Sequence, residues 1–165
     1  MALSSVVKNF RNGTIVLKDA TGGTPLDVTV QYEAGNLSIS GLKKRLNETV
    51  TYLDRGELGS VRHTNRTFPT ISFTAHMTEF SDATNENLLD IIMRTGAFAS
   101  AVSTLGPSAD VYTLTMTLTV EGTDLGDATD HTCIATDVEW SIDFAEGDPN
   151  TFTINGTCYG TVTFT

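Results

Sequence analysis

The chain has 165 residues, a formal net charge of −10 and 39% hydrophobic residues. A chain of this length is expected to form one domain, residues 1–165, whose core needs no metal or disulfide to hold it. The acidic balance argues against nucleic-acid binding by counterion release, and no apolar run is long enough for a signal peptide or a membrane helix. We therefore expect a soluble protein of the cytosol.

Charge is distributed unevenly along the chain. Residues 1–66 contain nine of the ten basic residues, whereas residues 67–165 contain fourteen of the twenty acidic ones. This polarity favours copies that meet head to tail, basic end against acidic body, unless the folded domain intermixes the two halves in space.

The first predicted strands occupy residues 13–20 and 26–35, and a short strand piece follows at 36–41. In the second strand, Val28, Val30 and Tyr32 share one face. Val50 and Tyr52 are expected to anchor a further strand. The charged stretch 54–66 that follows is long for a loop in a small domain, which predicts a projecting loop or arm. A solvated hairpin without a partner is the alternative.

Residues 67–80 form the next predicted strand, with one face made of Ile71, Phe73, Ala75 and Met77. One short α-helix is expected at about residues 84–95. Its start has the capping candidates Ser81, Asp82 and Thr84, its last turn contains Arg94, and Gly96 is expected in the left-handed position at its end.

The three remaining long strands, at 111–122, 133–147 and 151–164, alternate in the same way. The first has Leu114, Met116 and Leu118 on one face and threonines on the other. In the second, the expected apolar face is Ile134, Val138, Trp140, Ile142 and Phe144. An apolar face opposite a face of hydroxyls and carboxylates is typical of a mainly β fold, a sandwich or barrel of antiparallel strands.

Side chains that commonly carry catalysis are scattered. His63, His76 and His131 lie far apart in the sequence and match no zinc spacing. Cys133 and Cys158 are expected to be reduced core residues, with a disulfide as the alternative. The pattern therefore predicts a protein that is not an enzyme and binds no cofactor.

A loop rich in acidic residues follows the strand at 111–122. Asp124, Asp127 and Asp130 supply oxygen ligands of the kind that calcium prefers, but their spacing does not match an EF-hand. We expect a solvated turn and no metal site.

The order of elements, with RGELGSVRHTNRTFPTISFTAHM followed by NENLLDIIMRTGAF, resembles the tail tube (major tail) proteins of long-tailed bacteriophages. These are related in fold to the tube proteins of type VI secretion systems. The resemblance covers most of the chain and implies a structural virion protein whose hexameric rings stack into a tube for genome ejection. It implies self-association, tape-measure and tail-terminator partners, no membrane, and assembly in the host bacterial cytoplasm.

Family members use a long loop or hairpin to contact the next ring. On this sequence the resemblance assigns that role to the arm residues Asp54, Arg55, Glu57, Arg62 and Arg66. Their basic members are expected to meet acidic groups such as Asp124, Asp127 and Asp130 of a neighbouring ring.

The lumen of such a tube tends to be acidic, so DNA passes through it without tight binding, because like charge repels phosphate and hydroxyls bind it weakly. The expected lumen residues are Asp137, Glu139 and Asp143, followed by Thr113, Thr115, Thr117 and Thr119. An ordinary solvated exterior is the alternative for these faces.

Two other functions remain open at this point. A monomeric β-sandwich binding module, for carbohydrate or for another virion protein, would need exposed aromatic side chains, and most aromatics here fall in the apolar series. A hydrolase would need an acid, a base and a nucleophile, and no such set is visible.

Overall fold

The computed structural model describes residues 13–30 and 36–165, and it is mainly β with antiparallel strand pairs. The strands are β1 Gly13–Lys18, β2 Asp27–Val30, β3 Ser38–Ser40, β4 Asn47–Asp54, β5 Glu57–Arg66, β6 Thr70–His76, β7 Leu114–Val120, β8 His131–Ala145, β9 Thr151–Cys158 and β10 Val162–Phe164. The helices are α1 Leu88–Met93, the 3-10 turn η1 Gly96–Phe98 and α2 Gly122–Leu125. Tyr32 of the predicted second strand lies outside the described residues.

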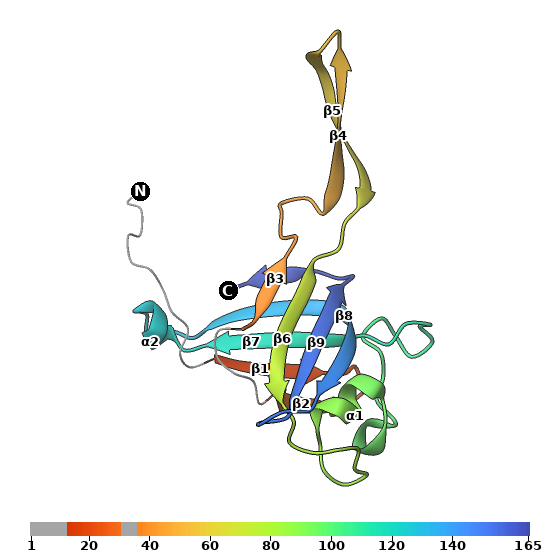
Figure 1. Cartoon of the computed structure of the whole chain (residues 1–165), viewed down its shortest axis with the longest axis vertical. Helices are drawn as coiled ribbons and strands as arrows, with labels where there is room; N and C mark the ends of the chain where they lie inside the picture. The colour runs from red at the N-terminus through yellow and green to blue at the C-terminus, as the bar shows by residue number, and fades with distance from the viewer. Residues whose placement is uncertain (1–12, 31–35) are drawn as a thin grey trace.

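Eight strands form one sheet in the order β2-β1-β7-β8-β9-β6-β3, with β10 also paired to β8. In Figure 1, β1 and β7 run across the body while β6 and β9 cross them at a steep angle. Buried residues of both groups belong to one hydrophobic core. The sheet is therefore folded into two crossed layers, a sandwich and not a closed barrel, and among the described strands β2 and β3 lie at its ends.

The corner between the layers lies within β8. Leu114 pairs with Val138 and Met116 pairs with Ala135, so β8 contains one extra residue at this point. Asp137 occupies the left-handed region with a φ of 52°. Such a bulge bends and twists a strand, which lets the first part of β8 pair with β7 and β10 and its last part with β9.

The predicted apolar faces are confirmed on three strands. Alternate residues of β6, β7 and β9 are buried, among them Phe73, Met116 and Ile154. The prediction is wrong for the start of β8, where Cys133 and Ala135 are buried and Ile134 is only half-buried. The bulge inverts the alternation, so residues before and after it follow opposite parity.

The predicted helix is shorter than expected. It begins after Asn87, whose side chain accepts a hydrogen bond from the Asp90 N–H, and it ends at Arg94, which adopts the left-handed conformation. The predicted caps at residues 81–84 and a last-turn role for Arg94 are therefore wrong. Gly96 also has a positive φ of 51°, where an added Cβ would lie 2.3 Å from the carbonyl oxygen of Asp82.

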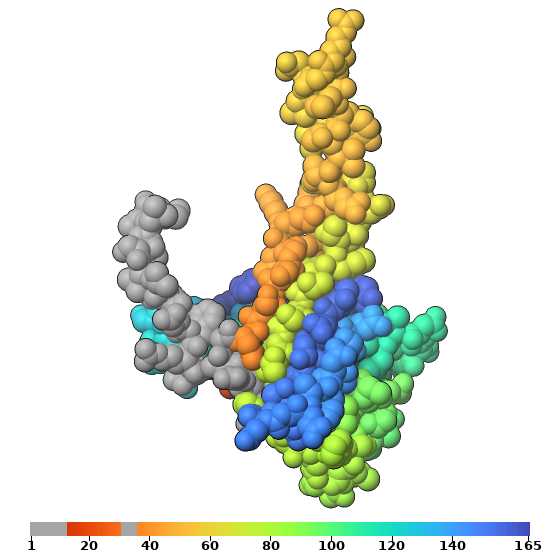
Figure 2. Space-filling view, in the orientation of Figure 1, coloured from red at the N-terminus to blue at the C-terminus, as the bar shows by residue number. Residues whose placement is uncertain are grey.

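The predicted arm is a β-hairpin that begins earlier than residue 54. β4 and β5 pair only with each other among the described strands, and they project away from the body (Figures 1 and 2). Val50 and Tyr52 lie in a strand, as expected, but that strand is β4 of this hairpin, where they are 37% and 51% exposed. At about 3.3 Å per residue, the ten residues of β5 give an arm of about 30 Å.

Candidate functional site

The arm turns at Asp54, Arg55, Gly56 and Glu57. Arg55 and Gly56 have φ values of 50° and 89°, the left-handed pair that suits a tight hairpin turn. Asp54 pairs with Glu57 across the turn, so these predicted arm residues lie together at the tip. Arg62 lies further down the arm, opposite Val50.

One face of the distal arm is apolar. Leu53 pairs with Leu58 and Thr51 pairs with Val61, which places all of these side chains on one side of the hairpin. Leu53, Leu58 and Val61 are 64%, 63% and 53% exposed. A two-stranded hairpin with so little burial is marginally stable alone in water, so this face, here called the arm patch, is suited to a partner.

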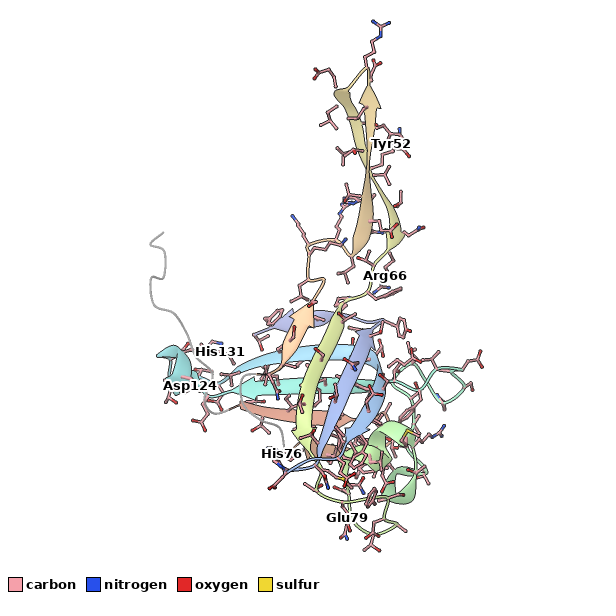
Figure 3. The ribbon with its side chains drawn as sticks, viewed as in Figure 1. Tyr52, Arg66, His76, Glu79, Asp124 and His131 are labelled. Atoms are coloured by element: carbon pink, nitrogen blue, oxygen red, sulfur yellow. The ribbon has the colours of Figure 1, made fainter. Side chains whose placement is uncertain are left out.

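Arg66 fixes the root of the arm to the body. Its Nη2 donates to the carbonyl oxygens of Tyr159 and Gly160 at 2.8 and 3.0 Å, and its guanidinium lies 5.4 Å from the centre of the Phe68 ring. Figure 3 shows Arg66 at the junction and Tyr52 out on the arm. Sequence reasoning expected Arg66 to contact another ring, whereas the structure uses it within its own chain.

Tyr159 extends this junction onto the sheet. Its ring meets Phe68 edge to face at 5.1 Å, and its hydroxyl donates to Glu139 Oε2 at 2.6 Å. The hydrogen bond to the Glu139 carboxylate raises the pKa of Tyr159, because that bond favours the protonated phenol. The direction of the arm is thus coupled to the outer face of β6, β9 and β8.

That outer face is lined with hydroxyls and carboxylates. The strand register aligns Thr70 with Thr157 and Glu139, and Thr74 with Thr153 and Asp143. Between these rows lie Ser72, Asn155 and Ser141. We call this surface the acidic face; Glu139 and Asp143 are exposed on it.

The structure does not bring the seven predicted lumen residues together. Thr115, Thr117 and Thr119 are half-buried on the outer side of the other layer, beside Val16 and Lys18 of β1. Asp137 is half-buried at the β8 corner. Because the two outer faces point away from a shared core, they cannot both line one channel.

Thr113 is fully buried and is not available on any surface, which corrects its prediction as a lumen residue. Its hydroxyl lies 3.0 Å from the Ser103 hydroxyl and 2.8 Å from the Thr104 hydroxyl, and it accepts a hydrogen bond from the Leu105 N–H. It precedes β7, so the strand alternation does not govern it.

The carboxylates of the acidic loop accept hydrogen bonds from backbone N–H groups nearby in the chain. Asp127 accepts hydrogen bonds from the N–H groups of Ala128 and Thr129, and its carboxylate lies 3.2 Å from His131 Nε2. All three contacts lower the pKa of Asp127; the Ala128 bond has the largest effect, followed by the Thr129 bond and then the His131 contact. Asp130 accepts from the Gly122 N–H. In the part of the chain that the structure describes, no three His, Cys, Asp or Glu side chains gather closely enough to hold a metal.

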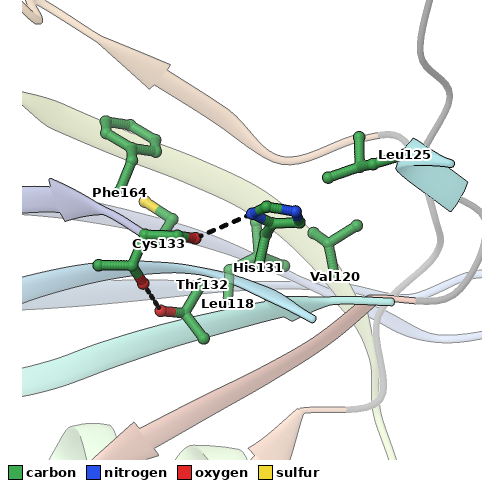
Figure 4. Close-up of a pocket in the computed structure, with 8 residues that line it drawn as sticks. Leu118, Val120, Leu125, His131, Thr132, Cys133 and Phe164 are labelled. Atoms are coloured by element: carbon green, nitrogen blue, oxygen red, sulfur yellow. Dashed lines mark hydrogen bonds between the residues drawn. The ribbon is translucent and has the colours of Figure 1, made fainter. Parts of the chain in front are cut away.

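An apolar cavity of about 320 Å³ lies beside this loop, and Leu118, Val120, Leu125 and Phe164 contribute to its lining. Figure 4 shows His131 at the cavity, hydrogen-bonded to the carbonyl oxygen of Thr165. Cys133, also in the lining, is buried with a free thiol, as is Cys158. Burial raises the pKa of both thiols, so neither is set up as a nucleophile.

Solved structures match this chain over nearly its whole length. A chain in the cryo-EM structure of an extracellular contractile injection system, PVC sheath/tube terminator in extended state, matches with a TM-score of 0.60 and 13% identity over 99% of both chains. The present chain and that chain have the same fold. A chain in the PVC sheath-tube complex in extended state gives 0.59 and 12%, over 99% of this chain and 93% of that one.

A third match is a chain in the anti-feeding prophage cap (AFP tube terminating cap), with a TM-score of 0.55 and 13% identity over 100% of this chain and 94% of that one. At these identities the likeness concerns the fold alone. No protein-family model and no curated protein matches the sequence.

Among the described residues, no helix is long and apolar enough to cross a membrane.

The aromatic side chains are more exposed than the sequence predicts. Phe144 and Phe164, which the alternation assigns to the apolar series, are 52% and 63% exposed, and Phe80 is 67% exposed. Phe80 and Phe144 lie near the end of the molecule opposite the arm, because Phe80 comes four residues after β6 and Phe144 is the next-to-last residue of β8.

Proposed function

We propose that this chain is a structural subunit of a tail-like tube in a phage or injection particle, forming hexameric rings that stack along a common axis. The observation that carries the proposal is the arm, a hairpin of about 30 Å that leaves a compact body and exposes five large hydrophobic side chains, three of them on the arm patch. A monomer gains nothing from such a hairpin, whereas an assembly buries it.

The fold supports the same role. Chains of this fold occur in the structures of an injection-system sheath/tube terminator, a sheath-tube complex and a tube terminating cap. The end strands β2 and β3 have backbone edges suited to joining sheets side by side around a ring. Tape-measure and terminator proteins are the further partners that this role implies.

The acidic face is the proposed lumen wall. It combines Glu139 and Asp143 with hydroxyls, whereas the opposite outer face contains Lys18 and the apolar Val16 and Ile134. A surface that repels phosphate lets DNA slide, so genome ejection through this channel needs no binding site. Thr115, Thr117 and Thr119 then lie on the outside of the tube.

Sedimentation velocity of the full chain tests the proposal, compared with a variant in which residues 47–66 are replaced by a short Gly-Ser turn. The full chain is expected to form large assemblies as its concentration rises, and the armless variant is expected to stop at single rings or smaller species. A full chain that stays monomeric at every concentration would favour a monomeric binding module instead.

A further inference from the structure

The apolar cavity beside α2 lies at one end of the sandwich, where the core meets the surface. Its buried part is formed by Leu118 and Val120 of β7 and by Cys133 of β8. Phe164 of β10 also lines the cavity but is 63% exposed, and Figure 4 shows it on the side opposite Leu125 of α2. Water finds few hydrogen-bond partners on such a surface, so the cavity is suited to an apolar side chain.

The chain enters the sheet beside this cavity. Gly13, the first residue of β1, pairs with Val120, the last residue of β7. Residues 1–12, which lie outside the described residues, are therefore attached next to a wall of the cavity. Neighbouring strands are about 4.8 Å apart, so β8 on the far side of β7 lies about 10 Å from Gly13. Phe10 precedes Gly13 by three residues, which at about 3.3 Å per residue gives the same reach of about 10 Å.

The composition of residues 1–12 suits an apolar site. Nearly half of them are large apolar residues, namely Met1, Leu3, Val6, Val7 and Phe10. Phe10 is the only aromatic residue among them and the nearest of the five to Gly13. Aromatic side chains bury about 150–250 Å² each, so this ring has the most to gain from the cavity.

Charge favours the same contact. Lys8 and Arg11 are the only charged side chains of residues 1–12, and both are basic. The stretch 121–130, which contains α2 and the acidic loop, has four acidic residues and no basic one. A segment that crosses the cavity therefore brings cations to the acidic loop, and opposite charges at close range attract each other.

We propose that residues 1–12 cover this cavity in their own chain, with the Phe10 ring between Phe164 and Leu125. Lys8 and Arg11 then lie beside the acidic loop. The tether at Gly13 gives the segment an effective concentration in the millimolar range, which a segment of another copy has to exceed. The contact requires neither rings nor tubes, so it stands or falls separately from the proposed function.

The reactivity of Cys133 tests whether the cavity is covered. Phe10→Ser in the full chain is expected to raise the rate at which a maleimide labels Cys133 at least tenfold, as measured by peptide mass spectrometry. Cys158 is fully buried and serves as the internal reference, because unfolding would expose both thiols. Phe80→Ser is the matched control, since Phe80 is exposed outside the cavity, and it is expected to leave the rate unchanged. Equal labelling of Cys133 in Phe10→Ser and the parent would overturn the proposal.

A disulfide identifies the segment that occupies the cavity. Phe10→Cys is expected to form a disulfide with Cys133 in oxidised glutathione, and the linked protein is expected to run as a monomer on a non-reducing gel. Leu105→Cys is the control and is expected to form none, because Leu105 precedes the opposite end of β7. Disulfide-linked dimers would assign the cavity to a second copy and overturn the intramolecular contact, and the absence of any link between positions 10 and 133 would overturn the proposal altogether.

Discussion

Replacing Asp90 with Ala tests how the end opposite the arm is held in shape. Asp90 is fully buried, and its carboxylate accepts from the Asp82 N–H at 2.9 Å, from Asn87 Nδ2 at 2.7 Å and from the Thr95 hydroxyl at 2.7 Å. Asp82 and Asn87 lie between Phe80 and α1, and Thr95 directly follows Arg94 at the end of that helix. The substitution therefore removes the common acceptor of this loop.

Hydrogen bonds to a charged group contribute roughly 1.5–3 kcal/mol each, and two of the donors here regain some water when the acceptor is lost. We expect Asp90→Ala to lower the free energy of unfolding by about 4 kcal/mol. At roughly 2–4 °C per kcal/mol for a domain of this size, the thermal midpoint falls by about 8–16 °C. Asp90→Asn is the control, since its remaining oxygen still accepts two of the bonds and its loss is expected to be less than half as large.

The pKa of Asp90 fixes the direction in which the stability changes with pH. Burial is the largest influence on Asp90 and raises its pKa, but hydrogen bonds from Ser81, Thr95, Asp82 and Asn87 together leave the pKa below its usual value. A group with a pKa lowered by folding stabilises the protein above its unfolded pKa, and that stability is lost as pH falls through the folded pKa.

Thermal unfolding followed by circular dichroism at pH 7 and at successively lower pH measures both effects. The difference between the parent and Asp90→Ala is expected to shrink as the pH falls below about 4. A loss below about 1 kcal/mol, or a difference that does not change with pH, would refute the role given to this carboxylate.

Three further predictions concern other parts of the molecule. Thr113→Val is expected to cost about 1–3 kcal/mol in denaturant unfolding, because it leaves buried partners unpaired; an unchanged midpoint would contradict its placement in the core. Gly156→Ala is expected to destabilise the fold in the same assay, since the added Cβ would lie 2.7 Å from the Trp140 ring; full stability would show that the ring moves aside freely. Charge reversal of Arg55 and Arg62 is expected to weaken ring stacking in sedimentation runs at low salt without changing the stability of the fold. Unaltered stacking would show that these charges do not contribute to the contact between rings.

Strands with unbroken alternation could be predicted from sequence. β7 repeats apolar and threonine side chains from Leu114 to Val120, and the structure buries the first set and half-exposes the second. The period of two fixes which residues face the core as long as no residue is inserted. β6 and β9 follow the same rule.

β8 could not be predicted in this way, because its bulge changes the parity in mid-strand. An aspartate in the left-handed region, Asp137, allows the insertion, and no local pattern distinguishes it from an ordinary outward-facing carboxylate. The folding of the sheet into two layers also divides the lumen candidates, since those of β7 and those of β8 lie on different outer faces.

The arm was predicted from residue 54 onward, with a hairpin among its expected forms, but its first strand β4 was not assigned to it. Both of its faces are exposed, so β4 and β5 have no buried side to impose alternation, and only the turn at Arg55 and Gly56 has a clear local signal. The exposure of Phe144 was missed because Phe144 belongs to the predicted inward series of β8. Phe144 is exposed because it lies where the sandwich ends, and no local sequence pattern indicates that position.

Cryo-EM of the full chain, concentrated until it assembles, tests the central claim most directly. We expect hollow tubes of stacked six-fold rings, with Glu139 and Asp143 of the acidic face lining the channel and each arm lying on the ring beyond. Particles without a channel, or tubes in which the acidic face lies on the outside, would contradict this account of the protein.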